Sequence, residues 1–146
     1  MDYTEFLDEY DENWEYSGQK EIKYAKTDIA FSPNFIATAG LEYSPRENFT
    51  LALTNKYVGK QFLDNTASEN RKIDAFFVSD FRMNYQTKVK NIGEIGITLL
   101  VNNVLNKMYA PNGYTYGWQQ GGERTSVNYF YPQAGRNFLL GVNLRF

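Results

Sequence analysis

Residues able to do acid–base, nucleophilic or metal chemistry are few in this chain. Its 146 residues include no histidine and no cysteine, which removes the commonest general base, the commonest metal ligand and the thiolate nucleophile. Asp74 and Asp80 could pair for acid–base catalysis, but six residues along one strand place them roughly 20 Å apart. We expect such charges to face water and to pair with Arg82 or Lys56. No Gly-x-Ser-x-Gly or Gly-x-x-x-x-Gly-Lys segment occurs, and the sequence predicts no catalytic residue, no cofactor and no enzyme.

Acidic side chains gather at the start of the chain. Residues 1–15 carry seven acids and no basic residue, whereas the rest carries all 15 lysines and arginines. The acids of segment 8–13 lack the alternating oxygen ligands and the turn glycine of an EF-hand loop, so we expect a solvated loop and no metal site. The basic residues are scattered singly, which argues against a nucleic-acid partner. The acidic start is the opposite of a secretory signal, so an outer-membrane protein would need upstream sequence to reach its compartment.

The stretch that looks most like a binding site is rich in tyrosine, tryptophan and glycine. We expect a long loop from Ala110 to Ser126, and long loops on a scaffold commonly carry binding residues. Tyr114, Tyr116 and Trp118 are its candidate substrate contacts, because such rings offer rigid, amphipathic contact area. The favoured alternative is that these rings pack against neighbouring loops or lie in an interfacial girdle. A girdle is the expected role of the tyrosines near predicted strand ends: Tyr43, Tyr57, Tyr85, Tyr109 and Tyr129 to Tyr131.

The end of the chain is an amphipathic strand. Its even positions are all large and apolar, and its odd positions are mostly polar or small, which is the period of a β-strand with one apolar face. The apolar residues are Phe138, Leu140, Val142, Leu144 and Phe146. An apolar strand that runs to the last residue is unusual in a water-soluble protein.

The remaining segments predict an all-β fold, an antiparallel up-and-down meander of about six long strands. Long connections are expected near 11–20, 59–71 and 110–126, and short ones near 44–48 and 87–93. In a meander this alternation places the long loops at one end and the short turns at the other, as in a transmembrane β-barrel. The strand candidates are Tyr3–Tyr10, Ile29–Tyr43, Phe49–Tyr57, Ile73–Tyr85, Ile95–Asn102 and a final strand from about Val127. The alternation in Tyr3–Tyr10 is weak, and a short helical turn is the alternative there. A soluble all-β sandwich or barrel also alternates, so the pattern alone leaves that alternative open.

Two motifs carry a resemblance to a known family. The segment Val101–Tyr109 (Val-Asn-Asn-Val-Leu-Asn-Lys-Met-Tyr) resembles the Asn-Leu-Phe-(Asn/Asp)-Lys-x-Tyr box on the penultimate strand of TonB-dependent outer-membrane receptors. The segment Pro132–Phe138 is similar to the Pro-x-x-Gly-Arg-x-Phe that opens their last strand, which ends in Phe as here. Asp64-Asn65-Thr66 and Asn112–Tyr116 look like the variety common in Bacteroidetes-type members. The resemblance, in the order and spacing of these segments, extends over residues 28–146.

The resemblance implies that residues 1–146 are the C-terminal portion of a receptor barrel, with the plug domain and TonB box absent. Phe138, Leu140, Val142, Leu144 and Phe146 would then form the strand for barrel assembly and closure. The implied partners are outer-membrane lipid, the rest of the barrel and plug, the barrel-assembly machinery, and TonB through the plug. The implied role is active uptake of a siderophore, vitamin or glycan in the outer membrane. The alternative is a soluble all-β module that binds a glycan or peptide through its Tyr/Trp-rich loop.

Overall fold

A computed structural model describes all residues from 1 to 146, and every regular element in it is a β-strand. The structure contains no helix that is long and apolar enough to cross a membrane. The chain divides into two compact units, each built from three separate segments. Unit 1 comprises Met1–Asn34, Gly59–Ala75 and Ala110–Pro132, and unit 2 comprises Phe35–Val58, Phe76–Tyr109 and Gln133–Phe146.

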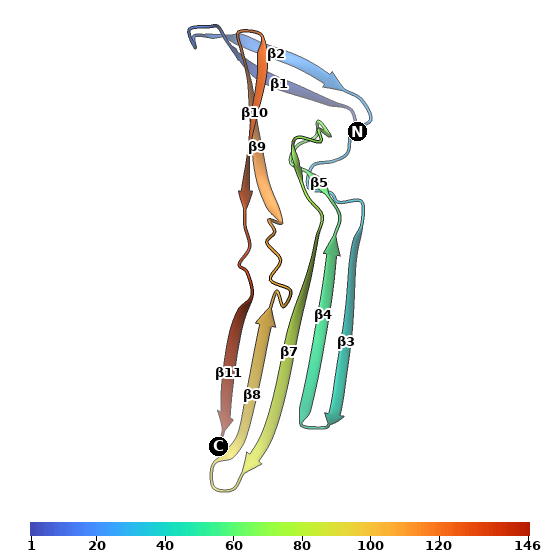
Figure 1. Ribbon diagram of the computed structural model, residues 1–146, viewed down its shortest axis with the longest axis vertical. Coiled ribbons are helices and arrows are strands. Elements are labelled where there is room, and N and C mark those ends of the chain that lie inside the picture. Colours follow the sequence, from blue (N-terminus) through green and yellow to red (C-terminus); the bar gives the residue numbers. More distant parts are fainter. The chain divides into compact units, whose positions relative to one another are not determined.

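Unit 2 is a five-stranded antiparallel meander with the order β11-β8-β7-β4-β3 (Figure 1). Neighbouring strands are consecutive within the unit, so β11 and β3 are its two edges. Its strands are β3 (Ile36–Arg46), β4 (Phe49–Val58), β7 (Phe76–Val89), β8 (Gly93–Asn102) and β11 (Asn137–Arg145). Lengths of 9 to 14 residues match the roughly 9–11 residues that a tilted strand needs to cross a bilayer.

One face of the unit 2 sheet is apolar across all five strands, because paired residues of an antiparallel ladder point to the same side. We call this the apolar face. Its rows follow from the register: Leu140, Leu99, Met83, Leu51 and Tyr43; Phe138, Val101, Phe81, Leu53 and Leu41; and Val142, Ile97, Tyr85 and Phe49. The last strand leaves Phe138, Leu140, Val142 and Leu144 between 53% and 68% exposed. The apolar face is therefore not the surface of a core within this chain.

The opposite face, here the polar face, carries mainly polar and small residues. Its rows include Gly141, Thr98, Asn84 and Thr50; Asn143, Gly96 and Gln86; and Leu139, Leu100, Arg82, Ala52 and Glu42. Polar side chains bond across the strands, with Thr98 donating to Asn84 at 3.0 Å and Asn102 donating to Asn137 at 2.9 Å. The sheet is thus amphipathic as a whole.

Unit 2 has one small buried cluster, made by Val58, Phe76 and Val78 with the ring of Tyr109 packed against it. The rings of Phe76 and Tyr109 are stacked with their centroids 4.5 Å apart. The cluster lies where β4 ends and β7 begins. The buried apolar side chains of unit 2 therefore lie at one end of its sheet.

Unit 1 is a four-stranded sheet with the order β10-β9-β1-β2, together with a short hairpin of β5 and β6. Its strands are β1 (Tyr3–Tyr10), β2 (Tyr16–Tyr24), β9 (Asn112–Gln120), β10 (Glu123–Tyr131), β5 (Gln61–Phe62) and β6 (Lys72–Ile73). The pairing of β1 with β9 is parallel, unlike every other pairing in the chain. Leu7, Phe62, Leu63 and Ile73 are buried and form the apolar part of its interior.

The all-β class and the antiparallel meander are confirmed, but the strand boundaries differ from the sequence prediction. The expected loop from Ala110 to Ser126 is the β9–β10 hairpin, turned by Gly121 and Gly122, both with positive φ. Positive φ at both central residues is the type I′ turn that suits a two-residue hairpin. The expected final strand from about Val127 is two strands, β10 and β11, which belong to different sheets.

The beginning of the chain also differs from the prediction. The strand expected from Ile29 begins at Ile36, because the Phe31 amide bonds to the Phe62 carbonyl and Phe31 has a positive φ of 55°. Residues 16–24, which fall mostly in the expected loop, form β2. The first candidate strand, Tyr3–Tyr10, is β1 and pairs within unit 1. The meander therefore has five strands.

Candidate functional site

Aromatic side chains gather on one face of the unit 1 sheet. Tyr114, Tyr116 and Trp118 occupy alternate positions of β9 and share that face, as strand geometry requires. Tyr129 lies directly opposite Tyr114 in the ladder, and the two rings stack with centroids 4.8 Å apart and planes 15° apart. We call this surface the aromatic face. It comprises Tyr10, Trp14, Tyr16, Tyr114, Tyr116, Trp118, Tyr129 and Tyr131.

The rings of the aromatic face are in contact but stay open to solvent. Ring centroids are 5.7 Å apart for Tyr116 and Trp118, and 6.5 Å apart for Trp118 and Trp14. Apart from Tyr10 and Trp118, which are half-buried, these side chains are 46% to 61% exposed. A contiguous exposed apolar patch of this kind marks an interaction surface more often than a chance feature of a monomer.

Trp14 is held in place by the turn between β1 and β2. Its backbone has a positive φ of 64°, an unusual conformation for a bulky side chain. The Asp11 carboxylate accepts hydrogen bonds from the amides of Asn13 at 2.8 Å and Glu15 at 2.9 Å, and the Asp11 carbonyl accepts from Trp14 at 3.2 Å. The turn thus fixes an exposed tryptophan beside Trp118, and such backbone strain is characteristic of functional surfaces.

The opposite side of the same sheet is buried and charged. Glu5 and Arg71 are 7% and 3% exposed, and the Arg71 guanidinium bonds to Glu5 at 2.6 Å and to Asp64 at 2.7 Å. Arg124 reaches the second oxygen of Glu5 at 2.6 Å and the hydroxyl of Tyr24 at 2.7 Å. We call Glu5, Tyr24, Asp64, Arg71 and Arg124 the ion cluster. It joins all three segments of unit 1.

The ion cluster satisfies its buried charges internally. Burial lowers the pKa of the Arg71 guanidinium, but its hydrogen bonds to Glu5 and Asp64 outweigh burial and raise that pKa above its ordinary value. Tyr24 also donates to Glu5 at 2.9 Å. A buried charge is tolerated only when it is paired and hydrogen-bonded in this way. The cluster therefore acts as a positioning element behind the aromatic face.

Glycines of β9 make room for this packing. A Cβ at Gly117 would lie 2.6 Å from an Arg71 nitrogen and 3.4 Å from Leu7. A Cβ at Gly113 would overlap the backbone carbonyl of Tyr129 and lie 3.1 Å from Leu63. The alternation of glycine and aromatic residues in β9 thus gives one face that packs closely and one that presents rings.

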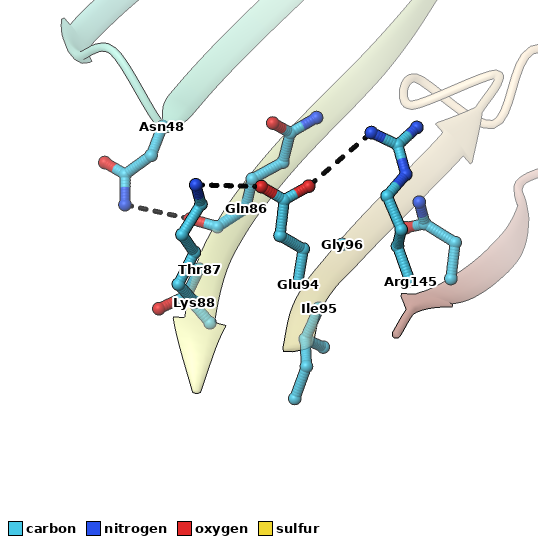
Figure 2. A pocket seen from close by; sticks show the side chains of 9 residues that line it. Asn48, Gln86, Thr87, Lys88, Glu94, Ile95, Gly96 and Arg145 are labelled. Carbon is cyan, nitrogen blue, oxygen red and sulfur yellow. Dashed lines mark hydrogen bonds and ion pairs between the residues drawn. The ribbon is translucent and has the colours of Figure 1, made fainter. Parts of the chain in front are cut away.

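A second candidate site is a polar groove of about 340 Å³ on the unit 2 sheet, near the short turns (Figure 2). Glu94 lies between Lys88 at 3.1 Å and Arg145 at 3.6 Å, so three neighbouring strands form a cross-strand charge ladder. Asn48 donates to the Gln86 carbonyl at 2.9 Å beside it. The groups are exposed and paired. Their arrangement offers hydrogen-bonding and ionic contacts but no catalytic constellation.

The two sequence motifs meet in unit 2. Asn103 is 4% exposed with a φ of 51°, and its side chain bonds to the backbone of Lys107 and to the Ala134 carbonyl. Asn106 accepts from the Arg136 amide at 2.9 Å, and the Arg136 side chain donates to the Val104 carbonyl at 2.9 Å. The motif residues therefore join the connection after β8 to the segment before β11 by hydrogen bonds. Their contacts are structural.

The structure places the tyrosines expected in a girdle on two different surfaces. Tyr129 and Tyr131, expected in a girdle, belong to β10 and stand in the aromatic face. Tyr43 and Tyr85 lie on the apolar face of unit 2. The pairing expected for Asp80 is wrong: it accepts from the Asn103 amide at 2.8 Å and makes no ion pair with Arg82 or Lys56. No group of three or more acidic side chains is arranged to hold a metal ion.

Sequence reasoning missed Tyr10, Trp14 and Tyr16 as members of the aromatic face, and it missed the ion cluster entirely. A signal for the three aromatic residues was present, since a Tyr-x-x-x-Trp-x-Tyr spacing falls in a turn beside β1. No local signal in the sequence could predict the ion cluster. Glu5, Arg71 and Arg124 come from segments more than 50 residues apart.

Comparison with known proteins identifies the fold. No protein-family model and no curated protein sequence matches the chain. Among solved structures, the chain is similar to the ferric citrate transporter FecA in its unliganded form, with a TM-score of 0.53 and 20% identity. The similarity covers 77% of this chain and 17% of the transporter chain, so this chain spans about a sixth of that length. At this identity the likeness shows the fold alone, an all-β arrangement shared with part of that transporter.

Proposed function

We propose that this chain supplies C-terminal strands and surface loops of a TonB-dependent outer-membrane receptor that takes up nutrients. The observation that carries the proposal is the amphipathic sheet of unit 2. Its apolar face extends over five strands and leaves large side chains more than half exposed, and its other face is polar. A transmembrane barrel needs this division between lipid and a wet interior.

The fold similarity to FecA and the two motifs support the same proposal. Under it the chain lies in the cell outer membrane, with the apolar face against lipid. Its partners are the other barrel strands, a plug domain, the barrel-assembly machinery and, through the plug, TonB. We expect no nucleic-acid partner. The edges β3 and β11 would pair with further strands, because unpaired edges invite aggregation.

The proposal extends to receptor type and to the last strand. We propose a Bacteroidetes-type receptor, on the strength of the Asp64-Asn65-Thr66 and Asn112–Tyr116 resemblance. Phe138, Leu140, Val142, Leu144 and Phe146 would form the assembly and closure strand, with Phe146 at the chain end. The candidate nutrients are siderophores, vitamins and glycans, and Tyr114, Tyr116 and Trp118 are the proposed substrate contacts.

Two neighbouring substitutions in β11 test the membrane assignment. Leu140 pairs with Leu99 on the apolar face, whereas Gly141 pairs with Thr98 on the polar face, where an added Cβ would make ordinary contact with Thr98 at 3.9 Å. Arginine on a lipid-facing position near mid-bilayer costs about 2–4 kcal/mol. We expect Leu140→Arg to reduce the heat-modifiable receptor in outer-membrane fractions several-fold, and Gly141→Arg to leave most of it.

The matched pair makes the outcome decisive. Both variants add the same charged side chain to the same strand, one residue apart, so expression and charge effects cancel. Equal loss for the two variants, or equal tolerance, would contradict the proposal that the apolar face contacts lipid.

A further inference from the structure

We propose that the apolar face of unit 2 holds an anionic glycerophospholipid at its short-turn end, with the lipid phosphate on Arg46. This inference rests on the proposed function and goes beyond it, because it gives one position of the lipid-facing surface a specific ligand. Three features carry it: a single arginine on the apolar face, a bulge that places it there, and an apolar hollow beside it.

Arg46 is the one charged residue among the strand residues of the apolar face. It pairs with Phe49, so it extends the apolar row that contains Tyr85 and Ile97. Every other position of that face, in all five strands, is apolar, aromatic, glycine or an uncharged polar residue. The Arg46 side chain is exposed and takes part in none of the ion pairs of the chain.

A β-bulge turns Arg46 toward the apolar face. Tyr43 also lies on that face, and side chains alternate along a strand, so the third residue after it would normally point to the polar face. The register shifts between Tyr43 and Arg46, where Ser44 and Pro45 oppose one residue of β4. Bulges re-aim side chains in this way, and proline is compatible with them because it has no amide for the ladder. The bulge thus places a positive charge on a face that is otherwise uncharged.

An open apolar hollow of about 480 Å³ lies beside Arg46. Its other lining residues come from β3, β4, β7 and β8: Pro45, Phe49, Met83, Tyr85 and Ile97. The rings of Phe49 and Tyr85 meet edge to face with their centroids 6.3 Å apart. A mostly apolar wall with one charged group, at this volume, is typical of a small-ligand site. The combination fits an amphiphile with an acyl chain in the hollow and an anion at the guanidinium.

The charges at this end of the sheet favour an anion at Arg46. Glu47, the nearest acid in the sequence, lines a hollow on the polar face instead. The charge ladder also lies on the polar face, and its members pair with one another. Lys90 is exposed in the β7–β8 turn and does not line the apolar hollow. Arg46 is therefore left without a carboxylate, and its fork of N–H groups matches a phosphate in geometry as well as in charge.

The position of Arg46 along its strand corresponds to the headgroup region of a membrane. Arginine is costly in the middle of a lipid-facing strand, but the cost nearly vanishes at the interface. Arg46 is the last residue of β3 and precedes a short turn, and short turns of outer-membrane barrels face the periplasm (Figure 1). The phosphates at that interface belong to glycerophospholipids. The phosphate of phosphatidylglycerol is uncompensated, whereas the ammonium of phosphatidylethanolamine would compete with Arg46 for its own phosphate.

The test uses the full-length receptor purified in detergent. Phosphatidylglycerol, phosphatidylethanolamine and phosphatidylcholine with identical acyl chains are titrated separately, and bound lipid molecules are counted by native mass spectrometry. Inorganic phosphate tests the anion without an acyl chain. We expect one phosphatidylglycerol to be bound about tenfold more tightly than either zwitterionic lipid, and inorganic phosphate to displace none of it.

Three variants locate the site. Arg46→Gln should weaken phosphatidylglycerol binding about tenfold and abolish the preference over the zwitterionic lipids. Met83→Trp fills the hollow and keeps the face apolar, so it should weaken binding of all three lipids. Lys90→Gln is the matched control, because it removes an exposed positive charge from the same end of the sheet but outside the hollow. It should keep the affinity and the preference of the parent.

Several results would overturn the inference. These are equal binding of the three lipids, an unchanged preference in Arg46→Gln, unchanged affinity in Met83→Trp, and displacement of the lipid by inorganic phosphate. A loss in Lys90→Gln equal to that in Arg46→Gln would also overturn it, because general attraction to a basic rim would then explain the binding. If Leu140→Arg and Gly141→Arg differ as expected and the lipid tests fail, the lipid inference falls and the proposed function stands. If those two variants behave alike, the proposed function fails first.

Discussion

The two units of this chain differ in where they place their apolar side chains. Unit 1 encloses Leu7, Phe62, Leu63 and Ile73 at 6% exposure or less, and buries a charged cluster with them. Unit 2 has one small buried cluster and leaves most of its large apolar residues outward, with Leu140 at 68%. Unit 1 therefore carries its own interior, whereas unit 2 depends on its surroundings.

One alternating β-strand pattern therefore occurs in two different surroundings. In β9 and in β11 alternate residues are large and apolar or aromatic. In β9 the intervening residues include glycines that pack on Leu63 and Arg71, so the aromatic side is a surface over a dense interior. In β11 the intervening residues face a polar surface, so the apolar side has no interior beneath it. What packs against the other face of the strand therefore determines whether an alternating pattern forms a surface over a dense interior, as in β9, or one side of an amphipathic sheet, as in β11.

The largest effect is expected from Glu5→Ala in unit 1. This change leaves Arg71 buried with Asp64 alone and removes a partner of Arg124. Breaking a buried ion pair costs about 3–5 kcal/mol. We expect amides of β1 and β9 to exchange with deuterium at least a hundredfold faster in the full-length protein, with β8 and β11 unchanged.

Glu12→Ala is the control for Glu5→Ala, because Glu12 is an exposed acid of the same segment. It should leave exchange in both units at the parent rate. Faster exchange in β11 of the Glu5 variant would show that the two units are not independent in stability, contrary to the expectation that unit 1 carries its own interior.

A smaller effect is expected in unit 2 from Asn103→Ala. The change places alanine at a φ of 51° and removes three hydrogen bonds of a buried amide. Left-handed backbone costs a non-glycine residue about 1–2 kcal/mol, and unsatisfied buried groups add about 1–3 kcal/mol. We expect a loss of about 2–5 kcal/mol in the free energy of unfolding, measured by denaturant titration of the full-length protein.

Asn103→Gly separates the two causes of that loss. Glycine accepts the left-handed backbone but still lacks the amide, so this variant should recover about 1 kcal/mol of the alanine penalty. Equal losses for the glycine and alanine variants would show that backbone conformation contributes nothing at this position.

The sequence predicted the part of the fold that local periodicity controls. Alternation of apolar and polar residues along the strand candidates, together with the order of long and short connections, predicted an antiparallel meander, and the structure confirms the meander. The β9–β10 hairpin was read as a loop because four glycines outweighed the alternation of Tyr114, Tyr116 and Trp118. The pair Gly121-Gly122 was the missed signal, since it is typical of a two-residue hairpin turn.

The rest of the candidate site depends on contacts distant in sequence. The parallel pairing of β1 with β9 brings Asp8 beside Trp118, 110 positions along the chain. Arg71 and Arg124 reach Glu5 from two other segments, and no sequence motif around either arginine indicates its contact with Glu5. The period of the apolar residues and the residue types in turns determine local structure, namely single strands and hairpins. They carry no information on which segments share a sheet.

The smallest expected effect comes from the charge ladder of unit 2, which is the exposed counterpart of the ion cluster. Lys88 and Arg145 are more than 80% exposed, and Glu94 between them is 44% exposed. Water and salt screen such pairs, which typically contribute about 0–1 kcal/mol. We expect Glu94→Gln to lower the free energy of unfolding by less than about 1 kcal/mol, and 0.5 M salt to remove most of that difference. A loss comparable to that of Glu5→Ala, persisting in salt, would contradict the distinction between buried charge in unit 1 and solvated charge in unit 2. It would mean that in the complete protein the polar face of the sheet is covered.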